Sequence, residues 1–309
     1  VPGHWPNHKP VYDEFAVTAQ HMREVDACDV YTPPSYNKPF LSSPLLTIVR
    51  EKHRAAAQAD GTIAKGRVAI DMKTSGLNAC FEPWRFQYDG VDAAARLMRP
   101  GAFIGKTDLR KYFLYLPASP RLQRYLWFSD PRNEGAADWR GTGKPSAAWV
   151  EHHRRRAGRT GRWRGFKTCP FGIAVLPAFA SFLSGEMCRF ARALGIDKVV
   201  MMIDDALIVA QSHGECKRRM SLMCDLFRTL GLQPADDKTE GPAETLDFLG
   251  FDLDSTKEII TVKQSRLQSA GKHMRRMVAA GSATCDALRS LAGKLSWFAI
   301  VLPGARSFM

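Results

Sequence analysis

The stretch that most constrains the fold is residues 198–210, in which two apolar runs flank a pair of aspartates. The runs 199–203 and 206–210 are rich in Val, Ile and Met, which favours two short strands. Asp204 and Asp205 lie between them, so the pattern predicts a β-hairpin with two carboxylates at its tip. Two interpretations are open: a solvated turn, in which Asp is common, or part of a metal site, if a third acid meets the pair.

A candidate for the third acid is Asp108, which follows the strand-like residues 102–106. Pro177 begins a predicted helix that Gly195 ends, and a second helix is expected over residues 215–230. The order is therefore strand, helix, hairpin, helix, strand. This is the ferredoxin-like order, in which helices cover one face of an antiparallel sheet, and it predicts an α+β fold.

The first of these helices carries a stripe of apolar side chains, which we interpret as part of the core. They keep helical spacing and are Phe179, Phe182, Leu183, Phe190 and Leu194.

The net charge of +13 is concentrated in two blocks of the chain. Residues 139–167 hold nine Lys or Arg against one acid, and residues 263–309 hold eight against one. A basic surface can simply aid solubility, but two concentrated blocks favour a polyanionic partner such as nucleic acid. The seven cysteines form no Cys-x-x-Cys pair, which argues against structural zinc and for a reducing, intracellular compartment. The sequence predicts neither a signal peptide nor a membrane span.

Four other segments have simpler predictions. Residues 1–44 lack periodicity and are expected to form an extended arm that is packed on the body of the protein or trails from it, and residues 45–59 are expected to be helical. Residues 129–164 are rich in Gly, Arg and Trp and are expected to form a mobile surface loop. Residues 263–280 are basic and amphipathic, and Thr284 is expected to N-cap a further helix, so the chain ends in a helical hairpin.

Seven motifs occur in a fixed order between residues 65 and 308. They are Lys65–Asp71 with Leu77-Asn78, Lys106–Phe113, Cys169–Gly172, Ile203-Asp204-Asp205, Gly231-Leu232 with Lys238-Thr239-Glu240, Phe248–Phe251, and Leu291–Leu295 with Pro303–Arg306. This series resembles the reverse transcriptases of retroelements, and is most similar to those of LTR and tyrosine-recombinase retrotransposons.

The resemblance implies an RNA-directed DNA polymerase, a nucleotidyltransferase with a right-hand fingers, palm and thumb architecture. The expected division, by residue number, is an N-terminal extension (1–44), fingers (45–102), palm (103–117), fingers with a basic insertion (118–166), palm with a primer-contacting hairpin (167–258), and thumb with the start of a connection (259–309). The implied partners are an RNA template, a DNA or RNA primer, dNTPs, and other retroelement or ribonucleoprotein proteins, with no membrane.

The resemblance also assigns roles to individual residues. Asp108, Asp204 and Asp205 would hold two Mg²⁺ ions, or Mn²⁺, as two-metal nucleotidyl transfer requires. Lys238 would act catalytically beside the pyrophosphate leaving group, although a lone Lys in a loop need have no such role. The remaining implied contacts are, to the nucleotide, Lys65, Arg67, Phe113, Phe171 and Gly172; to the primer, Met202, Phe248, Leu249 and Gly250; and to nucleic acid generally, Arg154, Arg155, Arg156, Arg159, Arg162, Arg164, Lys263, Lys272, Arg275 and Arg276.

Some of these residues have plainer interpretations. Phe113 would be a steric gate that excludes a 2′-hydroxyl, or a core aromatic, and Arg67 would bind phosphate or form a surface ion pair. Met202 stands where Tyr is common in the family, and Tyr112 stands where a small residue is usual. These departures keep a second hypothesis open, in which the chain is a domesticated reverse-transcriptase fold that binds RNA as a structural part of a ribonucleoprotein.

Overall fold

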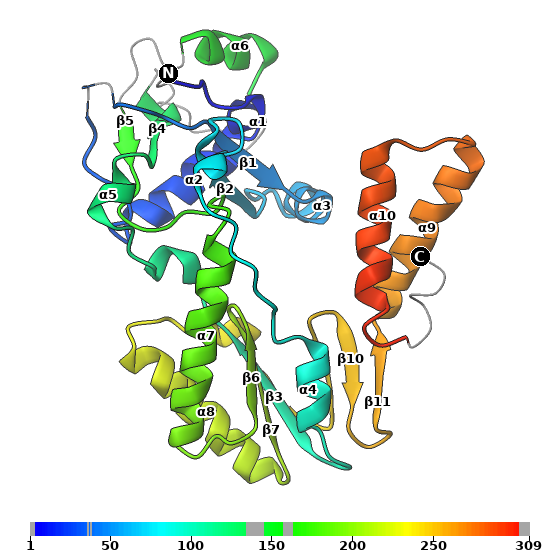
Figure 1. Ribbon diagram of the computed structural model, residues 1–309. Coiled ribbons are helices and arrows are strands. Elements are labelled where there is room, and N and C mark those ends of the chain that lie inside the picture. The colour runs from blue at the N-terminus through cyan, green and yellow to red at the C-terminus, as the bar shows by residue number, and fades with distance from the viewer. Residues whose placement is uncertain (1–3, 36, 38, 134–144, 157–162, 303–309) are drawn as a thin grey trace. The chain divides into compact units, whose positions relative to one another are not determined.

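The computed structural model describes residues 4–35, 37, 39–133, 145–156 and 163–302 (Figure 1). The chain divides into two compact units. The first unit comprises Val1–Arg85 and Lys111–Pro177, and the second comprises Phe86–Arg110 and Ala178–Met309. None of the helices in the described ranges is long and apolar enough to cross a membrane.

The first unit is built from short helices and two small sheets. Its elements are α1 (Lys9–Asp13), α2 (Phe15–Asp26), β1 (Leu45–Val49), α3 (Glu51–Asp60), β2 (Gly66–Ile70), η1 (Leu77–Cys80), η2 (Tyr112–Tyr115), α5 (Pro120–Gln123), β4 (Trp127–Ser129), η3 (Pro131–Asn133), α6 (Ala147–Arg156) and β5 (Trp163–Gly165). Strands β1 and β2 pair antiparallel, as do β4 and β5.

Three expectations for the first unit were wrong. Residues 45–49 form strand β1 rather than helix, because pairing with β2 buries alternate side chains, and only the following residues are helical. The expected N-terminal arm is not extended, because it contains α1 and α2, and both helices bury side chains. The hydroxyl oxygens of Thr18 in α2 and Thr47 in β1 lie 2.7 Å apart. The expected loop at 129–164 contains α6 and part of β5; residues 134–144 and 157–162 lie outside the described ranges.

The second unit holds the longer helices and the largest sheet. Its elements are α4 (Val91–Leu97), β3 (Phe103–Asp108), α7 (Leu176–Ala193, which begins at the end of the first unit), β6 (Val199–Met202), β7 (Asp205–Ala210), α8 (His213–Thr229), η4 (Asp236–Lys238), β8 (Glu240–Ala243), β9 (Thr245–Phe248), β10 (Phe251–Asp254), β11 (Ile259–Val262), α9 (Gln264–Ala280) and α10 (Cys285–Phe298).

The four-stranded sheet of this unit has the order β6-β7-β3-β8, and the pairs β6-β7, β7-β3 and β3-β8 are all antiparallel. This confirms the predicted ferredoxin-like order of strand, helix, hairpin, helix and strand. Alternate side chains of β3 and β7, among them Ile104, Leu207 and Val209, enter a core shared with Phe248 and Phe251 of the β9-β10-β11 sheet. The apolar runs of the sequence are therefore strands buried by their own unit.

The two C-terminal helices agree with their prediction. Helix α9 begins at Gln264 and α10 begins at Cys285, and the Thr284 hydroxyl accepts a hydrogen bond of 3.2 Å from the Ala287 amide. This is the side-chain N-cap that satisfies a free amide in the first turn. Phe298 of α10 reaches the core of the second unit, which anchors the helical hairpin.

The apolar stripe of α7 is not core. Phe182, Phe190 and Leu194 are each more than half exposed, and Phe179 is 37% exposed. The buried side of α7 is instead lined by Met187 and four smaller residues, Ala180, Ser184, Cys188 and Ala191. Helical spacing located a stripe but could not decide which side of the helix is covered.

Candidate active site

The three predicted acids are positioned by the central strands of the second unit. In the β3-β7 pair Asp108 is the direct partner of Asp205, and the Leu109 amide donates to the Asp204 carbonyl at 3.1 Å. The hairpin turn itself is formed by Ile203 and Asp204, and Asp205 is already the first residue of β7. Two of the acids therefore face each other across a strand pair, and the third occupies the adjoining turn.

The electrostatics of this cluster show mutual repulsion. The pKa of Asp205 is raised to about 7, first by burial and then by the carboxylates of Asp204 and Asp108, while Lys238 acts in the opposite direction. Asp108 is only 9% exposed, and its Oδ2 accepts a hydrogen bond of 2.8 Å from Lys238 Nζ. Its other oxygen, Oδ1, is buried without a donor. An acceptor without a donor in such a place is costly unless a cation or a proton meets it.

These residues fit a hard divalent cation by their chemistry. Carboxylate oxygens are the ligands that Mg²⁺ prefers. The buried Oδ1 of Asp108 has no donor while Asp205 is ionised, and a hydrogen bond between the two carboxyl groups is one cause of the raised pKa of Asp205. Within the described ranges, however, no three His, Cys, Asp or Glu side chains already stand in a metal-binding arrangement. The Lys238 ammonium instead supplies the positive charge beside Asp108.

The turn that holds Asp204 is supported by Ser184, which the sequence motifs did not include. Ile203 has a φ of 59°, which is unusual for a β-branched residue, and its carbonyl accepts a hydrogen bond from the buried Ser184 hydroxyl of α7. On the other side of β3, the Ala235 amide donates to the Asp108 carbonyl at 2.7 Å. In the sequence, the one indication of this hydrogen bond was the presence of Ser184 among the small residues of the predicted helix.

The first unit brings together three of the predicted nucleotide-contacting residues. The Arg67 guanidinium lies 5.4 Å from the centroid of the Phe171 ring, and Phe113 meets that ring edge-on at 4.9 Å. Arg67 is exposed and Phe113 is half-buried, so neither is a core residue. Lys65 is exposed just before β2, and the structure gives it no contact with this group.

Gly172 has a structural reason to be glycine. Its φ is 120°, and a Cβ there would lie 2.0 Å from the carbonyl oxygen of Ile70. The Ile70 amide in turn donates to the Phe171 carbonyl, so the loop lies directly against the end of β2. Asn78 holds the same loop, donating to the Gly172 carbonyl at 2.9 Å and accepting from the Ala174 amide at 2.9 Å.

A second residue missed in the sequence is His21 of α2. Burial lowers the pKa of His21, Glu24 opposes this, and the nearby charges of Lys111 and Arg67 lower it further. The N-terminal segment therefore reaches the surroundings of Arg67. No motif marked this segment, because its contribution depends on the packing of α2.

The predicted primer-contacting hairpin exists, and Phe248 within it is buried. Leu249 and Gly250 form the two-residue turn between β9 and β10, and both have positive φ, as a type I′ turn requires. Phe248 is buried in the core of the second unit, so its side chain is not available to a primer. Met202, at the end of β6, is half-buried.

The predicted nucleic-acid contacts have different outcomes. Lys272, Arg275 and Arg276 are exposed on α9, and Lys263 forms an ion pair of 2.7 Å with Asp247. Arg159 and Arg162 lie outside the described ranges, and of Arg154, Arg155 and Arg156 only the helical backbone is described.

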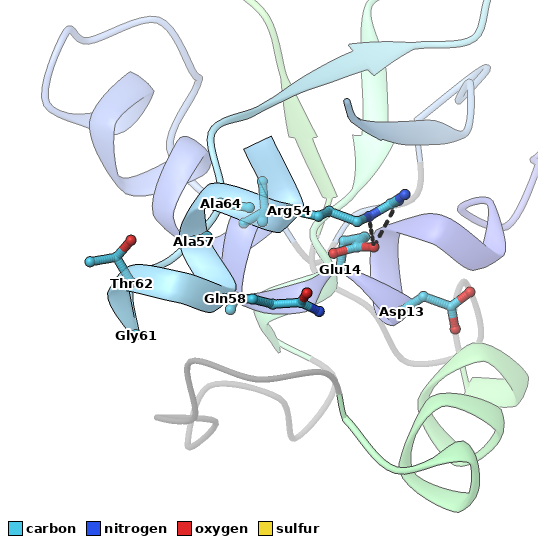
Figure 2. Close-up of a pocket in the computed structure, with 10 residues that line it drawn as sticks. Asp13, Glu14, Arg54, Ala57, Gln58, Gly61, Thr62 and Ala64 are labelled. Carbon is cyan, nitrogen blue, oxygen red and sulfur yellow. Dashed lines mark hydrogen bonds and ion pairs between the residues drawn. The ribbon is translucent and has the colours of Figure 1, made fainter. Parts of the chain in front are cut away.

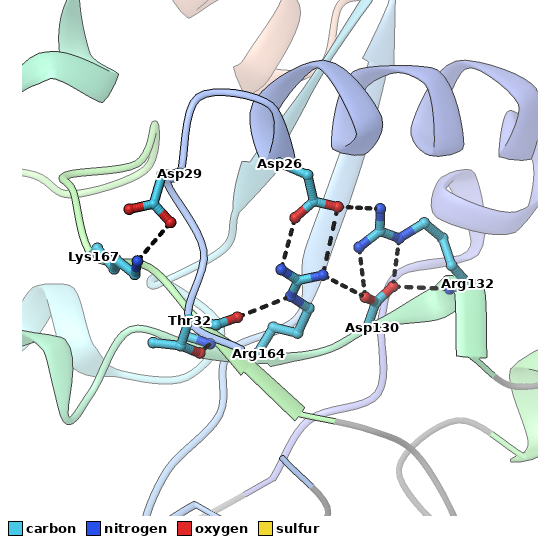
Figure 3. A network of polar contacts seen from close by, with 8 residues as sticks. Asp26, Asp29, Thr32, Asp130, Arg132, Arg164 and Lys167 are labelled. Carbon is cyan, nitrogen blue, oxygen red and sulfur yellow. Dashed lines mark hydrogen bonds and ion pairs between the residues drawn. The ribbon is translucent and has the colours of Figure 1, made fainter. Parts of the chain in front are cut away.

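Arg164 is a correction, because it belongs to an internal ionic network rather than to a free basic surface. Figure 3 shows Arg164 and Arg132 both directed at the carboxylates of Asp26 and Asp130. Arg164 Nη2 lies 2.7 Å from Asp26 Oδ1, and its guanidinium lies 5.2 Å from the centroid of Tyr31. This network joins the end of α2 to β4 and β5 within the first unit.

A cavity in the first unit lies apart from all the predicted site residues. It has a volume of about 240 Å³ and is lined by parts of α1, α2 and α3. Figure 2 shows Arg54 directed at Glu14 beside it, in an ion pair of 2.9 Å. Sequence reasoning gave no indication of this cavity, and its one charged pair is already neutralised.

No protein-family model and no curated protein sequence matches this chain. Its fold is similar to that of the foamy viral protease-reverse transcriptase in complex with double-stranded DNA, with a TM-score of 0.61, 13% identity, and coverage of 96% of this chain and 42% of that chain. A second complex of that protein with double-stranded DNA has a TM-score of 0.62 and 12% identity, with coverage of 96% of this chain and 50% of that chain. Its complex with an RNA/DNA hybrid has a TM-score of 0.61 and 11% identity, with coverage of 99% of this chain and 34% of that chain.

The chain thus spans half or less of the length of these solved proteins. The similarity extends over nearly the whole of this chain, while identity stays low, so it concerns the fold. The chain has an α+β fold of the reverse-transcriptase type.

Proposed function

We propose that this chain is an RNA-directed DNA polymerase of the retrotransposon type, which extends a primer by two-metal nucleotidyl transfer. The observation that carries the proposal is the pairing of Asp108 with Asp205 beside Asp204, with a buried carboxylate oxygen that has no donor. A turn needs no such arrangement, and the repulsion among three acids is unfavourable unless a cation or a proton offsets it.

The acids and the nucleotide-contacting residues have separate roles in this proposal. In the second unit Asp108, Asp204 and Asp205 would hold two Mg²⁺ ions, which supply charge neutralisation at the primer 3′-oxygen and the triphosphate. Lys238 now pairs with Asp108; once a cation replaces it there, its ammonium is free to donate a proton to the leaving pyrophosphate. In the first unit Arg67 would bind phosphate oxygens beside the Phe171 ring, and Phe113 would exclude a 2′-hydroxyl.

The second candidate function is a structural RNA-binding component of a ribonucleoprotein. It is favoured by one observation, the Lys238 ion pair, which neutralises Asp108 without any metal. The predicted division into fingers, palm and thumb, with nucleic acid bound by the basic side chains of α9, is compatible with either function.

Primer extension separates the two candidates. The assay uses RNA and DNA templates, dNTPs or rNTPs, and Mg²⁺ or Mn²⁺, with Asp204→Asn as the test variant and Asp225→Asn, an exposed acid of α8, as the control. We expect extension with dNTPs that falls at least about a hundredfold in Asp204→Asn and is unchanged in Asp225→Asn. Template binding without extension on any template would exclude the polymerase and leave the structural component.

A further inference from the structure

Among the described residues, the exposed face of α7 carries large apolar side chains that neither the sheet nor the proposed function uses. Phe182 and Phe190 are 55% and 54% exposed, Ala193 at the end of the helix is exposed, and Leu194 directly after the helix is 54% exposed. Exposed aromatic side chains in a row are unfavourable in water, and contiguous patches of this kind mark interaction sites.

Gly185 lies on this exposed side in the middle of the helix. Nothing lies within 4 Å of the position that a Cβ would occupy there, so packing within the chain does not require glycine. A glycine inside a helix costs about 1 kcal/mol relative to alanine. A small residue beside two large ones lets a second helix approach closely, which is a use that compensates this cost.

The charges on this face distinguish between partners. Glu186 and Arg189 form an exposed ion pair one turn apart, and Arg192 adds a single further charge to α7, so the helix lacks the concentrated basic charge that favours nucleic acid. The order of these charges is self-complementary: in an antiparallel pair of helices, a two-fold axis between residues 187 and 188 sets Glu186 of each copy opposite Arg189 of the other. The same axis sets Phe182 of each copy opposite the small side chain of Ala193.

We infer that α7 is a dimer interface at which a second copy of this chain packs antiparallel through Phe182, Glu186, Arg189 and Phe190. Such an interface is isologous, as in most homodimers, and each copy both buries its aromatic side chains and supplies the opposite charge. The inference is independent of polymerase activity, because the proposed dimer contacts lie on the exposed face of α7. Ser184, which donates to the turn that carries Asp204, lies on the buried face.

The test is sedimentation velocity of nuclease-treated protein over a range of concentrations. We expect a monomer–dimer equilibrium in which Glu186→Arg and Arg189→Glu each raise the dissociation constant by about tenfold or more, because like charges then face each other. The double reversal, E186R with R189E, restores the opposite charges and should return the constant to within about threefold of wild type.

A matched control removes an exposed Phe ring from a surface other than α7. Phe40 is 64% exposed in the first unit, so Phe40→Ser should leave dimerisation unchanged, whereas Phe190→Ser should weaken it about tenfold or more. Circular dichroism of each variant establishes that the fold is intact. A protein that is monomeric at every concentration, or a dimer that is insensitive to both single reversals, would overturn the inference.

Discussion

The ionisation of Asp205 depends strongly on the folded structure. Its pKa rises from 3.8 to about 7, chiefly through burial and then through Asp204 and Asp108. The folded protein therefore binds this proton more tightly than the unfolded chain. The stability that this proton provides is fully present below about pH 4 and is lost as the pH rises through about 7.

Asp205→Asn should remove this pH dependence. Without metal, the free energy of unfolding of wild type should fall by on the order of 2 kcal/mol relative to that of the variant between pH 5 and pH 8, because the carboxyl group ionises and the amide cannot. Urea denaturation in the presence of a chelator measures the difference, and Asp225→Asn serves as the control. Parallel pH profiles for Asp205→Asn and wild type would show that folding does not raise the pKa of Asp205.

Phe113 is the residue on which sugar selection depends in the proposed function. Its ring is half-buried and packs edge-on against Phe171. Phe113→Ala should lower the preference for dNTPs over rNTPs by about tenfold or more, since space opens for a 2′-hydroxyl. Tyr115→Ala, at an exposed aromatic residue two positions later, should keep the preference. Single-nucleotide incorporation measures both, and an unchanged preference in Phe113→Ala would reassign it to packing.

At the scale of elements, the ionic network of Asp26, Asp130, Arg132 and Arg164 explains how an N-terminal segment without periodicity becomes part of the first unit. Asp130 is fully buried, and Arg132 contacts it with two nitrogens, at 2.9 and 2.7 Å. Arg132 also reaches Asp26, at the end of α2, at 2.6 Å. Buried charges of this kind depend on every partner being present.

Asp130→Ala should therefore destabilise the first unit by about 3–5 kcal/mol, because it leaves two guanidinium groups partly unpaired. Asp286→Ala breaks an exposed pair with Arg289 on α10 and should cost less than about 0.5 kcal/mol. Chemical denaturation followed by tryptophan fluorescence compares the two, since Trp127 and Trp163 lie in β4 and β5. Equal effects would mean that the network contributes no more than a surface ion pair.

At the scale of the whole molecule, the distribution of charge matters more than its total. The chain has a net charge of +13, and the basic residues of α9 that the structure leaves exposed include Arg275 and Arg276. Contacts to phosphate release counterions, so each one adds to the salt dependence of binding.

R275A with R276A should reduce the salt slope of binding to an RNA/DNA hybrid by about 1.5, because two phosphate contacts are lost. K217A with R218A removes the same charge from an exposed part of α8 and should change the slope little. Fluorescence anisotropy over a series of salt concentrations measures the slope. An equal reduction in both variants would mean that binding responds to net charge and not to α9.

The sequence by itself determined the order of the elements in the second unit, the hairpin that carries Asp204 and Asp205, Asp108 as the third acid, and the Thr284 cap. These features depend on local periodicity and turn chemistry, which neighbouring residues specify.

Only the tertiary structure decided that residues 45–49 are a strand, that Arg164 pairs internally and that the stripe of α7 is exposed. In each case the deciding partner is distant in the chain: β2 for the strand, Asp26 for Arg164. A pattern of side chains shows that a face is apolar or charged, but what covers that face depends on contacts that the pattern does not contain.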